Sequence, residues 1–320
     1  MFKIEEVRMN IMLLGAAGFI GTNLSTPLAA IKSNKITLID SRAEHFLYSP
    51  VIGCSNVTIV ESEITETTDF NKLLIGQEVV YHLVSTTVPT TSNQHIAQEL
   101  SANVVMTARM LDAAVKCRVK KIVFLSSGGT VYGKEAQCPL YEDAVTNPIS
   151  SYGVQKVTIE KLLYLYWYMY GLDYRVIRLA NPYGPYQRPD GVQGAVTTFI
   201  YKALKGEEII VYGDGTVVRD FIYIDDAINA ILSISAGETS YRTFNIGSGF
   251  GTSIKQVLET IQNTLQIPVK TVYRSGRKVD VSVNYLDITR YENVYGKLNP
   301  IELKDGIVRT ADFLKKNYGL

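Results

Sequence analysis

The chain has 320 residues, and its 32 Lys and Arg against 31 Asp and Glu leave a formal net charge of +1. That balance does not support binding through a large positive charge, as nucleic acid or an anionic membrane often demands, so we expect neither partner. With 46% apolar and 20% charged residues, the composition is that of a folded globular protein, and the length fits one large domain or two fused ones.

The sequence also predicts the compartment. The three cysteines form no CxxC pair, and their odd number argues against a disulfide framework. Two glutamates precede any apolar run at the N-terminus, unlike a signal peptide, and no stretch reaches the about 18 apolar residues of a membrane helix. The three histidines show no metal-ligand spacing. We therefore expect a cytoplasmic protein without a metal site.

The first half of the chain alternates short apolar runs with longer amphipathic stretches. Predicted strands span 9–14, 35–40, 56–60, 78–84, 120–127 and 174–180, and predicted helices span 18–32, 94–116 and 151–171. Apolar strands that alternate with helices indicate a parallel sheet covered on both faces, and right-handed crossovers make it a Rossmann-type doubly wound sheet. Pro27 lies within the first helix and either kinks or shortens it.

The pattern changes after about residue 180. Residues 181–194 are rich in Gly, Pro and Asn and predict a loop. Further strands are predicted at 209–212, 219–224, 241–247 and 270–274, and further helices at 195–205, 225–235, 253–266 and 302–318. We expect an α/β fold with a first domain over 1–180, re-entered by about 222–247, and a smaller α/β C-terminal lobe formed by 181–221 and 248–320.

A glycine-rich turn with GxxGxxG spacing, Gly15 to Gly21, joins the first strand to the first helix. Glycines at such a turn let the backbone approach a pyrophosphate, and the helix N-terminus stabilises the anion. Asp40 ends the second strand, where a carboxylate binds the adenosine ribose and favours NAD over NADP, although Arg42 could soften that preference. The arrangement predicts that NAD binds here.

Tyr152 and Lys156 are four residues apart at the start of a predicted helix, so they share one face. A free phenol, with a pKa of about 10, is a poor base at neutral pH, but a nearby ammonium lowers that pKa. The pair follows the strand that ends in SSGGTVYG (126–133), and ligands of doubly wound sheets bind at the carboxyl ends of strands. The pair is a candidate for removing a proton from a sugar hydroxyl during hydride transfer.

Together these motifs resemble the extended short-chain dehydrogenase/reductase family. RLANPYGPYQ (178–187), GDGTVVRDFIYIDD (213–226) and FNIGSG (244–249) are similar to its NAD-dependent nucleotide-sugar epimerase/dehydratase branch, most of all to the UDP-glucose 4-epimerases. The resemblance runs from about Met9 to the C-terminus and implies a UDP-sugar substrate, with NAD bound by the first domain and the sugar nucleotide by the C-terminal lobe. It also implies a homodimer built from the helices near 94–116 and 151–171.

The resemblance assigns roles by matching position. Tyr152 is the implied base, and Lys156 binds the nicotinamide ribose and lowers the tyrosine pKa. The implied cofactor contacts, besides these two, are Gly15, Gly18, Phe19, Ile20, Gly21, Asp40, Glu63 and Ile64. The implied sugar-nucleotide contacts are Ser85, Asn181, Val211, Tyr212, Arg219, Arg277, Asp280 and Asn284. Of these, the two arginines bind the phosphates, for which guanidinium forks are suited.

One position departs from the family pattern. The third catalytic residue of the family is a Ser or Thr five positions before the glycine of VYG, and this chain has Gly128 there. Ser127 or Thr130 nearby, or a water, must then contact the reacting oxygen. Dehydratases of this branch carry Asp-Glu at the positions of Gly129 and Thr130, and related decarboxylases carry Glu at the latter. The missing carboxylate favours 4-epimerisation.

The sugar stays open. Asn284 occupies the family position that controls room for an N-acetyl group, and asparagine is smaller than tyrosine, so glucose, galactose and their N-acetylated equivalents all remain. Two further alternatives are an epimerase of a UDP-uronic acid and an NAD(P)-dependent reductase of a 4-keto nucleotide sugar. A cofactor-binding regulator without activity would not need Tyr152, Lys156 or the phosphate arginines.

Overall fold

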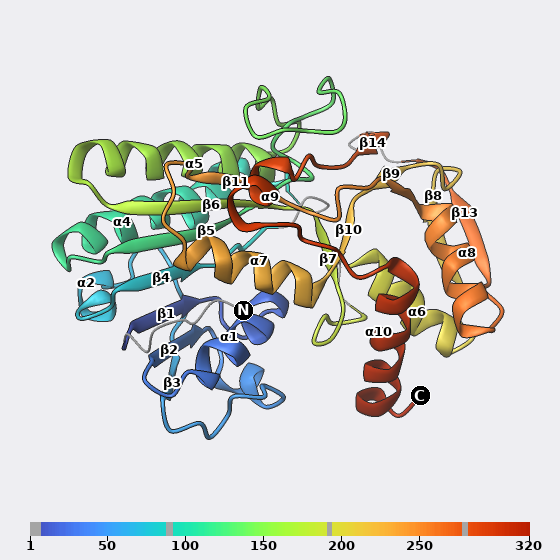
Figure 1. Cartoon of the computed structure of the whole chain (residues 1–320), viewed down its shortest axis with the longest axis horizontal. Helices are drawn as coiled ribbons and strands as arrows, with labels where there is room; N and C mark the ends of the chain where they lie inside the picture. The colour runs from blue at the N-terminus through green and yellow to red at the C-terminus, as the bar shows by residue number, and fades with distance from the viewer. Residues whose placement is uncertain (1–7, 88–91, 191–193, 277–280) are drawn as a thin grey trace. The chain divides into compact units, whose positions relative to one another are not determined.

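The computed structural model describes residues 8–87, 92–190, 194–276 and 281–320. The chain forms two compact units (Figure 1). Unit 1 comprises Met1–Ser126 and Ser151–Ile177, and unit 2 comprises Ser127–Ser150 and Arg178–Leu320. The division into a cofactor-binding domain and a sugar-binding lobe concerns what each part binds, and it stays a prediction.

A parallel sheet forms the centre of unit 1. Its strands are β1 (Asn10–Leu14), β2 (Lys35–Asp40), β3 (Val57–Glu61), β4 (Val79–His82), β5 (Lys121–Ser127) and β6 (Asp173–Leu179). They lie in the order β6-β5-β4-β1-β2-β3, so the winding reverses between β1 and β4. A seventh strand, β11 (Thr243–Ile246), follows β6, whose last two residues belong to unit 2. The predicted doubly wound α/β sheet is confirmed.

Helices cover the sheet of unit 1. They are α1 (Phe19–Ala30), the 3-10 turn η1 (Ala43–Phe46), α2 (Phe70–Leu74), α3 (Ile96–Leu100), the π-helical η2 (Ser101–Val105), α4 (Met106–Lys116) and α5 (Ser151–Tyr170). On one face, apolar side chains of β1, β4 and β5 pack against α4 and α5 in a core that includes Met12, Val80, Phe124, Met110 and Leu163. Pro27 lies inside α1, and the helix continues past it to Ala30.

The helix predicted at 94–116 needs a correction. The helical path covers 96–116, but its middle turn is π-helical. Asn103 lies in that turn with its side chain buried, and its amide donates to Thr86 Oγ1 and Gln155 Oε1 at 2.9 and 2.8 Å. These partners come from elsewhere in the chain, so the local apolar spacing could not reveal the change of pitch.

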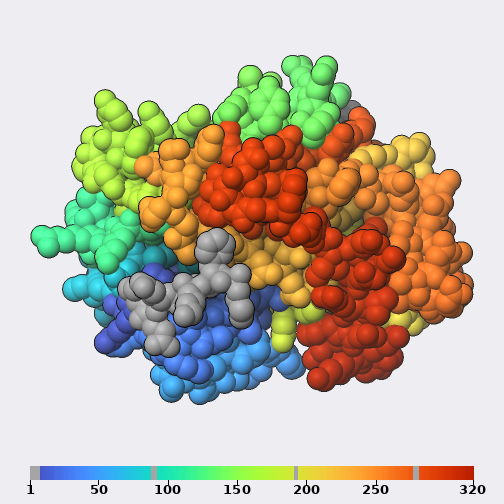
Figure 2. Space-filling view, in the orientation of Figure 1, coloured from blue at the N-terminus to red at the C-terminus, as the bar shows by residue number. Residues whose placement is uncertain are grey.

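Unit 2 is built from short strands and longer helices. In chain order it contains β7 (Asn181–Tyr183), α6 (Ala195–Leu204), β8 (Ile209–Tyr212), β9 (Val218–Arg219), β10 (Phe221–Tyr223), α7 (Ile224–Ala236), β11, β12 (Thr252–Ser253), α8 (Ile254–Leu265), β13 (Thr271–Arg274), β14 (Val283–Asn284), α9 (Thr289–Tyr295) and α10 (Leu303–Tyr318). Figure 2 shows α10 (red) beside α8 (orange) on the surface of this unit. None of the described helices is long and apolar enough to cross a membrane.

Two predictions for unit 2 were wrong. Residues 181–194 do not form a loop throughout, because they begin with β7, which pairs in parallel with β10. The strand predicted at 219–224 is two strands in different sheets, since β9 pairs with β12 and β14 while β10 pairs with β7. Asp220 separates them with a fully buried side chain. The apolar pattern of this stretch does not show that the chain passes from one sheet to another.

We predict that Gly21→Ala destabilises the protein by about 1–3 kcal/mol, the usual cost of overpacking. A Cβ at Gly21 would lie 2.5 Å from the carbonyl oxygen of Ala16, and backbone cannot yield as a side chain can. Gly18→Ala is the matched control, because its Cβ would make an ordinary 3.4 Å contact with Gly15. Thermal unfolding of both variants checks this, and equal midpoints would contradict it.

Candidate functional site

The glycine-rich turn between β1 and α1 is held against two strands of unit 1. Gly15 has a φ of +79°, and its N–H donates to Ile39 O at 2.9 Å. A Cβ at Gly15 would lie 3.1 Å from the backbone nitrogen of Val84, so the turn packs closely against the chain after β4. This close approach explains why glycine is needed at the first position of the motif.

Asp40, at the end of β2, closes the other side of this turn. Its Oδ2 accepts the N–H of Ala17 at 3.0 Å, and its Oδ1 accepts the N–H of Ser41 at 2.9 Å. Arg42, which could have altered the cofactor preference, pairs instead with Glu44 at 3.4 Å on the exposed surface. Oδ1 also lies 3.1 Å from His45 Nδ1, so the carboxylate is held at the turn and its free acceptor capacity is mainly on Oδ2.

Lys156 is a buried charge of unit 1. Only 5% of its surface is exposed, and its Nζ donates to Leu125 O at the end of β5 at 2.7 Å. The Nζ lies 5.4 Å from the ring centre of Tyr152 and 4.7 Å from that of Phe124. Burial lowers the pKa of Lys156 to about 8, although the nearby Glu160 carboxylate favours the charged form. The predicted pair therefore shares one site at the carboxyl end of β5.

A buried polar network that sequence reasoning missed fixes the start of α5. Asn93 Oδ1 accepts the N–H of Ser151 at 2.6 Å, and Glu99 Oε2 accepts its hydroxyl at 2.6 Å. Gln155 donates to the same Glu99 oxygen at 3.2 Å and accepts from Asn103 at 2.8 Å. The hydrogen bond from Ser151 lowers the pKa of Glu99. The four-residue spacing of Glu99 and Asn103 is the one signal for this network in the sequence.

Ser85 and the remaining cofactor residues also lie in unit 1. Ser85 donates to Thr87 O at 2.9 Å, and the N–H of Thr86 donates to Asn103 Oδ1, so this segment joins the network. Glu63 is exposed after β3, and Ile64 beside it is buried.

The loop after β5 explains the departure at Gly128. Its N–H donates to Leu179 O at 2.8 Å, and a Cβ there would lie 2.5 Å from Leu286 Cδ1. The Leu286 side chain therefore takes the space that a Ser or Thr would need. Asn284 donates weakly to Gly128 O, at 3.4 Å.

The two hydroxyls that flank Gly128 differ in their surroundings. Thr130 Oγ1 is buried and has no hydrogen-bond partner in the described part of the chain. Ser127 is partly exposed, and no hydrogen bond to its hydroxyl is found within the described ranges. The Ser126 hydroxyl is engaged by Glu160 at 2.5 Å. Of these three hydroxyls, that of Ser127 is the one open to an incoming molecule.

Three of the predicted sugar-nucleotide residues meet in unit 2. Asn181 donates its N–H and its Nδ2 to Asp220 O at 3.0 and 2.9 Å. Arg219, one residue earlier than Asp220, donates to Val281 O at 2.6 Å, and Asn284 lies opposite Arg219 in the pairing of β14 with β9.

Of the other predicted sugar-nucleotide residues, Val211 and Tyr212 lie in a separate sheet, formed by β8 and β13. Arg277 and Asp280 fall outside the described residues.

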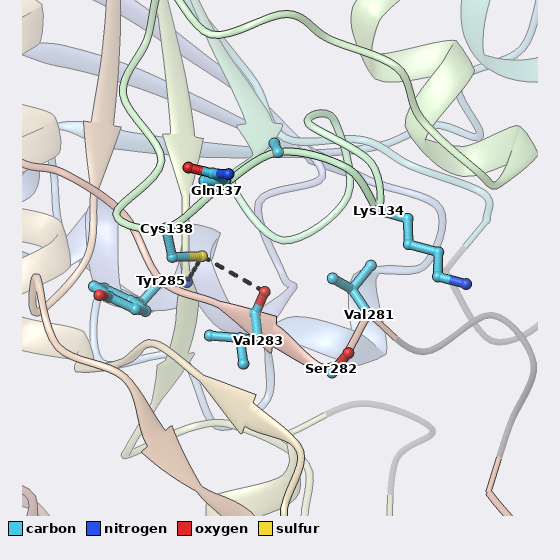
Figure 3. A pocket seen from close by; sticks show the side chains of 8 residues that line it. Lys134, Gln137, Cys138, Val281, Ser282, Val283 and Tyr285 are labelled. Carbon is cyan, nitrogen blue, oxygen red and sulfur yellow. Dashed lines mark hydrogen bonds between the residues drawn. The ribbon is translucent and has the colours of Figure 1, made fainter.

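A surface pocket of about 440 Å³ lies at β14, the strand that contains Asn284 (Figure 3). It is lined by Lys134, Ala136, Gln137, Cys138, Val281, Ser282, Val283 and Tyr285. The Cys138 thiol reaches Val283 O at 3.5 Å and accepts the N–H of Tyr285 at 3.4 Å, so it holds the 134–138 segment on β14. None of the predicted site residues that the structure describes lines this pocket.

The sequence also matches a known family. Residues 11–247 match the model of the NAD-dependent epimerase/dehydratase family. The chain belongs to this family. It is 33% identical over 312 residues to the UDP-glucose 4-epimerase of Mycolicibacterium smegmatis, which covers 96% of this chain and 99% of that protein.

Solved structures of epimerases have the same fold along almost the whole chain. The UDP-glucose 4-epimerase of Thermotoga maritima, solved with UDP-glucose, has a TM-score of 0.87 at 31% identity and covers 97% of this chain and 100% of that one. The UDP-glucuronic acid 4-epimerase of Bacillus cereus, solved with UDP-glucuronic acid and NAD, has a TM-score of 0.86 at 26% identity and covers 96% and 99%.

The residues of unit 1 fit the NAD that the family name implies. The N–H groups of Phe19 and Ile20, in the first turn of α1, have no acceptor among the residues that the structure describes. Such groups and the helix dipole attract a pyrophosphate, and Gly18 before them is exposed. The Asp40 carboxylate at the end of β2 suits the ribose hydroxyls.

We predict that activity declines as the pH rises above about 8, because Lys156 then loses the charge that favours the Tyr152 phenolate. Lys156→Arg should retain reduced activity without this decline, since guanidinium stays charged.

The stability of the folded protein should change in the opposite direction and increase over the same pH range. The pKa lies below its ordinary 10.5, so the unfolded chain holds more protons between about 8 and 10.5, and unfolding becomes harder as pH rises there. Rate profiles and thermal unfolding of both proteins check this, and a decline retained in the arginine variant would contradict it.

Proposed function

We propose that this protein is an NAD-dependent 4-epimerase of a UDP-sugar. The observation that carries the proposal is the buried Lys156 ammonium 5.4 Å from the Tyr152 ring, in a chain of the epimerase/dehydratase family. The relatives named UDP-sugar 4-epimerases match over nearly their full length, which supports the same reaction here.

The chain's own residues handle the proton in this proposal. Tyr152, as phenolate, takes the proton from O4 of the sugar, and the Lys156 ammonium stabilises that phenolate through space. NAD supplies the hydride acceptor and donor for C4 when it is bound. The 4-keto sugar turns within the site, and Tyr152 returns the proton to O4 of the inverted sugar.

Ser127 is the proposed third member of this catalytic set. Gly128 cannot present a hydroxyl, and a Cβ there would lie 2.5 Å from Leu286 Cδ1, so a Ser or Thr would require that side chain to move. Ser127 ends β5, two residues after the carbonyl that holds Lys156. Its partly exposed hydroxyl is suited to bind O4, whereas that of Thr130 is buried.

Epimerisation fits this loop better than the other reactions of the family. Gly129 and Thr130 supply no carboxylate, and elimination of water needs a general acid and base beyond the tyrosine. A reductase of a 4-keto nucleotide sugar is the alternative, and it needs a cofactor that leaves after each turnover. A second alternative is an epimerase of a UDP-uronic acid, like the UDP-glucuronic acid 4-epimerase of Bacillus cereus.

The sugar preference is proposed to depend on Asn284. Its side chain is 3% exposed and bonded to Gly128 O, next to the loop that carries Ser127. Glucose and N-acetylglucosamine, with their galacto epimers, are both proposed substrates. The positions proposed to contact cofactor and sugar nucleotide are those predicted from the sequence, including Arg277 and Asp280.

A homodimer in the cytoplasm completes the proposal. Five neighbouring side chains near the end of α5 are exposed although large and apolar: Tyr164, Leu165, Tyr168, Met169 and Tyr170. α4 packs beside α5, with Tyr166 donating to Asp112 at 2.6 Å, and the two helices could pair with a second copy. Free thiols at all three cysteines suit a reducing compartment. Sedimentation of single chains would contradict the dimer.

We predict conversion of UDP-glucose or UDP-N-acetylglucosamine to the galacto epimer without deuterium in the ring when proton NMR follows the reaction in D₂O. The hydride returns to C4 from within the site, so solvent does not exchange with it. Tyr152→Phe should retain bound NAD and lose turnover by at least about a hundredfold, within the range of general acid–base catalysis. Deuterium at C4, or full turnover by the variant, would contradict the mechanism.

A separate experiment tests whether Ser127 is the third catalytic residue. Ser127→Ala should lower kcat about ten- to a hundredfold, because the O4 proton loses a hydrogen-bond partner in the transition state. Thr130→Val keeps the volume and removes only the buried hydroxyl, so it should stay within about threefold of the unchanged enzyme. Steady-state kinetics of both variants decides between the residues, and the reverse order of effects would assign the role to Thr130.

A further inference from the structure

The carboxylate of Asp220 joins separate segments of unit 2. The residue is 0% exposed. Its Oδ1 accepts the N–H and the hydroxyl of Ser248, each at 2.7 Å, and its Oδ2 accepts the N–H of Leu286 at 3.2 Å and of Gly249 at 3.4 Å. A Cβ at Gly247 would lie 2.2 Å from Oδ2, so a glycine there makes room for the carboxylate.

The segments that Asp220 joins carry the residues proposed to bind the sugar nucleotide. Arg219 precedes it in the chain, and Asn181 bonds twice to its backbone oxygen. Leu286 follows two residues after Asn284, and its side chain packs against Gly128 beside Ser127. Asp220 thereby links Arg219 and Asn181 through its backbone with the strand of Asn284, which its carboxylate reaches through the N–H of Leu286.

Hydrogen bonds compensate for burying this charge. No Lys or Arg forms an ion pair with Asp220 among the residues described here. Desolvation raises the pKa of Asp220, and the donors on Ser248, Leu286 and Gly249 oppose that rise. A buried carboxylate without these donors would be costly, so the surrounding segments and Asp220 hold each other in place.

We propose that Asp220 is a positioning residue that sets the geometry of the sugar-nucleotide site, fixing Arg219, Asn181 and Asn284 relative to one another through the backbone. This role rests on the proposed function, because it concerns the same site. It explains why the chain changes sheets between β9 and β10 at a buried acid rather than at an apolar residue.

Asp220→Asn tests the role. The amide turns one acceptor into a donor that faces N–H groups, so one or more segments must move. The KM for the UDP-sugar and the Kd for UDP should rise about ten- to a hundredfold. Bound NAD should be unchanged, because Lys156 and the glycine-rich turn lie in unit 1, and kcat should fall by a smaller factor than KM rises, because only Ser127 of the proposed catalytic set lies in unit 2.

Asp226→Asn is the matched control. Asp226 is also buried, at 9% exposure, and its Oδ2 accepts a backbone N–H, that of Ile301, at 2.8 Å. It touches none of the proposed sugar-nucleotide residues through that bond. Its variant should lose thermal stability while its KM and its Kd for UDP stay within about twofold.

A milder variant keeps the test decisive if Asp220→Asn does not fold. Ser248→Ala removes one of the four donors and leaves the carboxylate, so the KM and Kd should rise about two- to fivefold. Unchanged KM and Kd in either variant, with stability lost as in the control, would overturn the positioning role and leave Asp220 a structural residue.

Hydrogen exchange separates this inference from the proposed function. In Asp220→Asn, peptides over 181–183, 248–253 and 283–286 should all exchange faster, whereas in Asp226→Asn only those near 301 should. If the protein without substitutions epimerises no UDP-sugar, the proposed function fails. The hydrogen-exchange rates and the Kd for UDP of the variants then still decide the role of Asp220. Faster exchange confined to 248–253 would contradict it.

Discussion

The end of β5 is the point on which the proposed chemistry depends. The carbonyl of Leu125 holds the Lys156 ammonium at 2.7 Å, and the next residue, Ser126, binds Glu160 on the same helix. Two contacts one helical turn apart fix both the rotation and the height of α5 on the strand. Because Tyr152 lies on the first turn of that helix, its place follows from the same two bonds.

Burial of Lys156 has two opposing effects: it strengthens the action of the ammonium on the phenol, and it lowers the pKa of the lysine itself. A buried ammonium acts on a phenol through little screening water, so it favours phenolate more than an exposed lysine would. The same burial brings the pKa of Lys156 down to about 8, close to the point where the charge is lost. The Glu160 carboxylate counters this, which links the Ser126 contact to the charge state of Lys156.

In unit 2, the residues Arg219 and Asn284, which are proposed to bind the sugar nucleotide, lie on short strands with few backbone hydrogen bonds. β9, β12 and β14 have two residues each, so the sheet alone holds them weakly. Asp220 adds side-chain acceptors where backbone pairing ends. The Leu286 side chain, which lies where a Cβ of Gly128 would be, then connects this group to the loop after β5.

Patterns local in the sequence were enough to predict the six strands of unit 1, the glycine-rich turn and the Tyr152–Lys156 pair, because each depends on residues a few positions apart. The π-helical turn at Ser101–Val105, the two strands on either side of Asp220 and the buried network at Glu99 were not predictable in this way. Their partners lie tens of residues away in the chain. The sequence by itself determined which groups are present, and the tertiary structure decided which hydroxyl is open and which acid is buried, since burial and hydrogen-bond partners exist only in the folded chain.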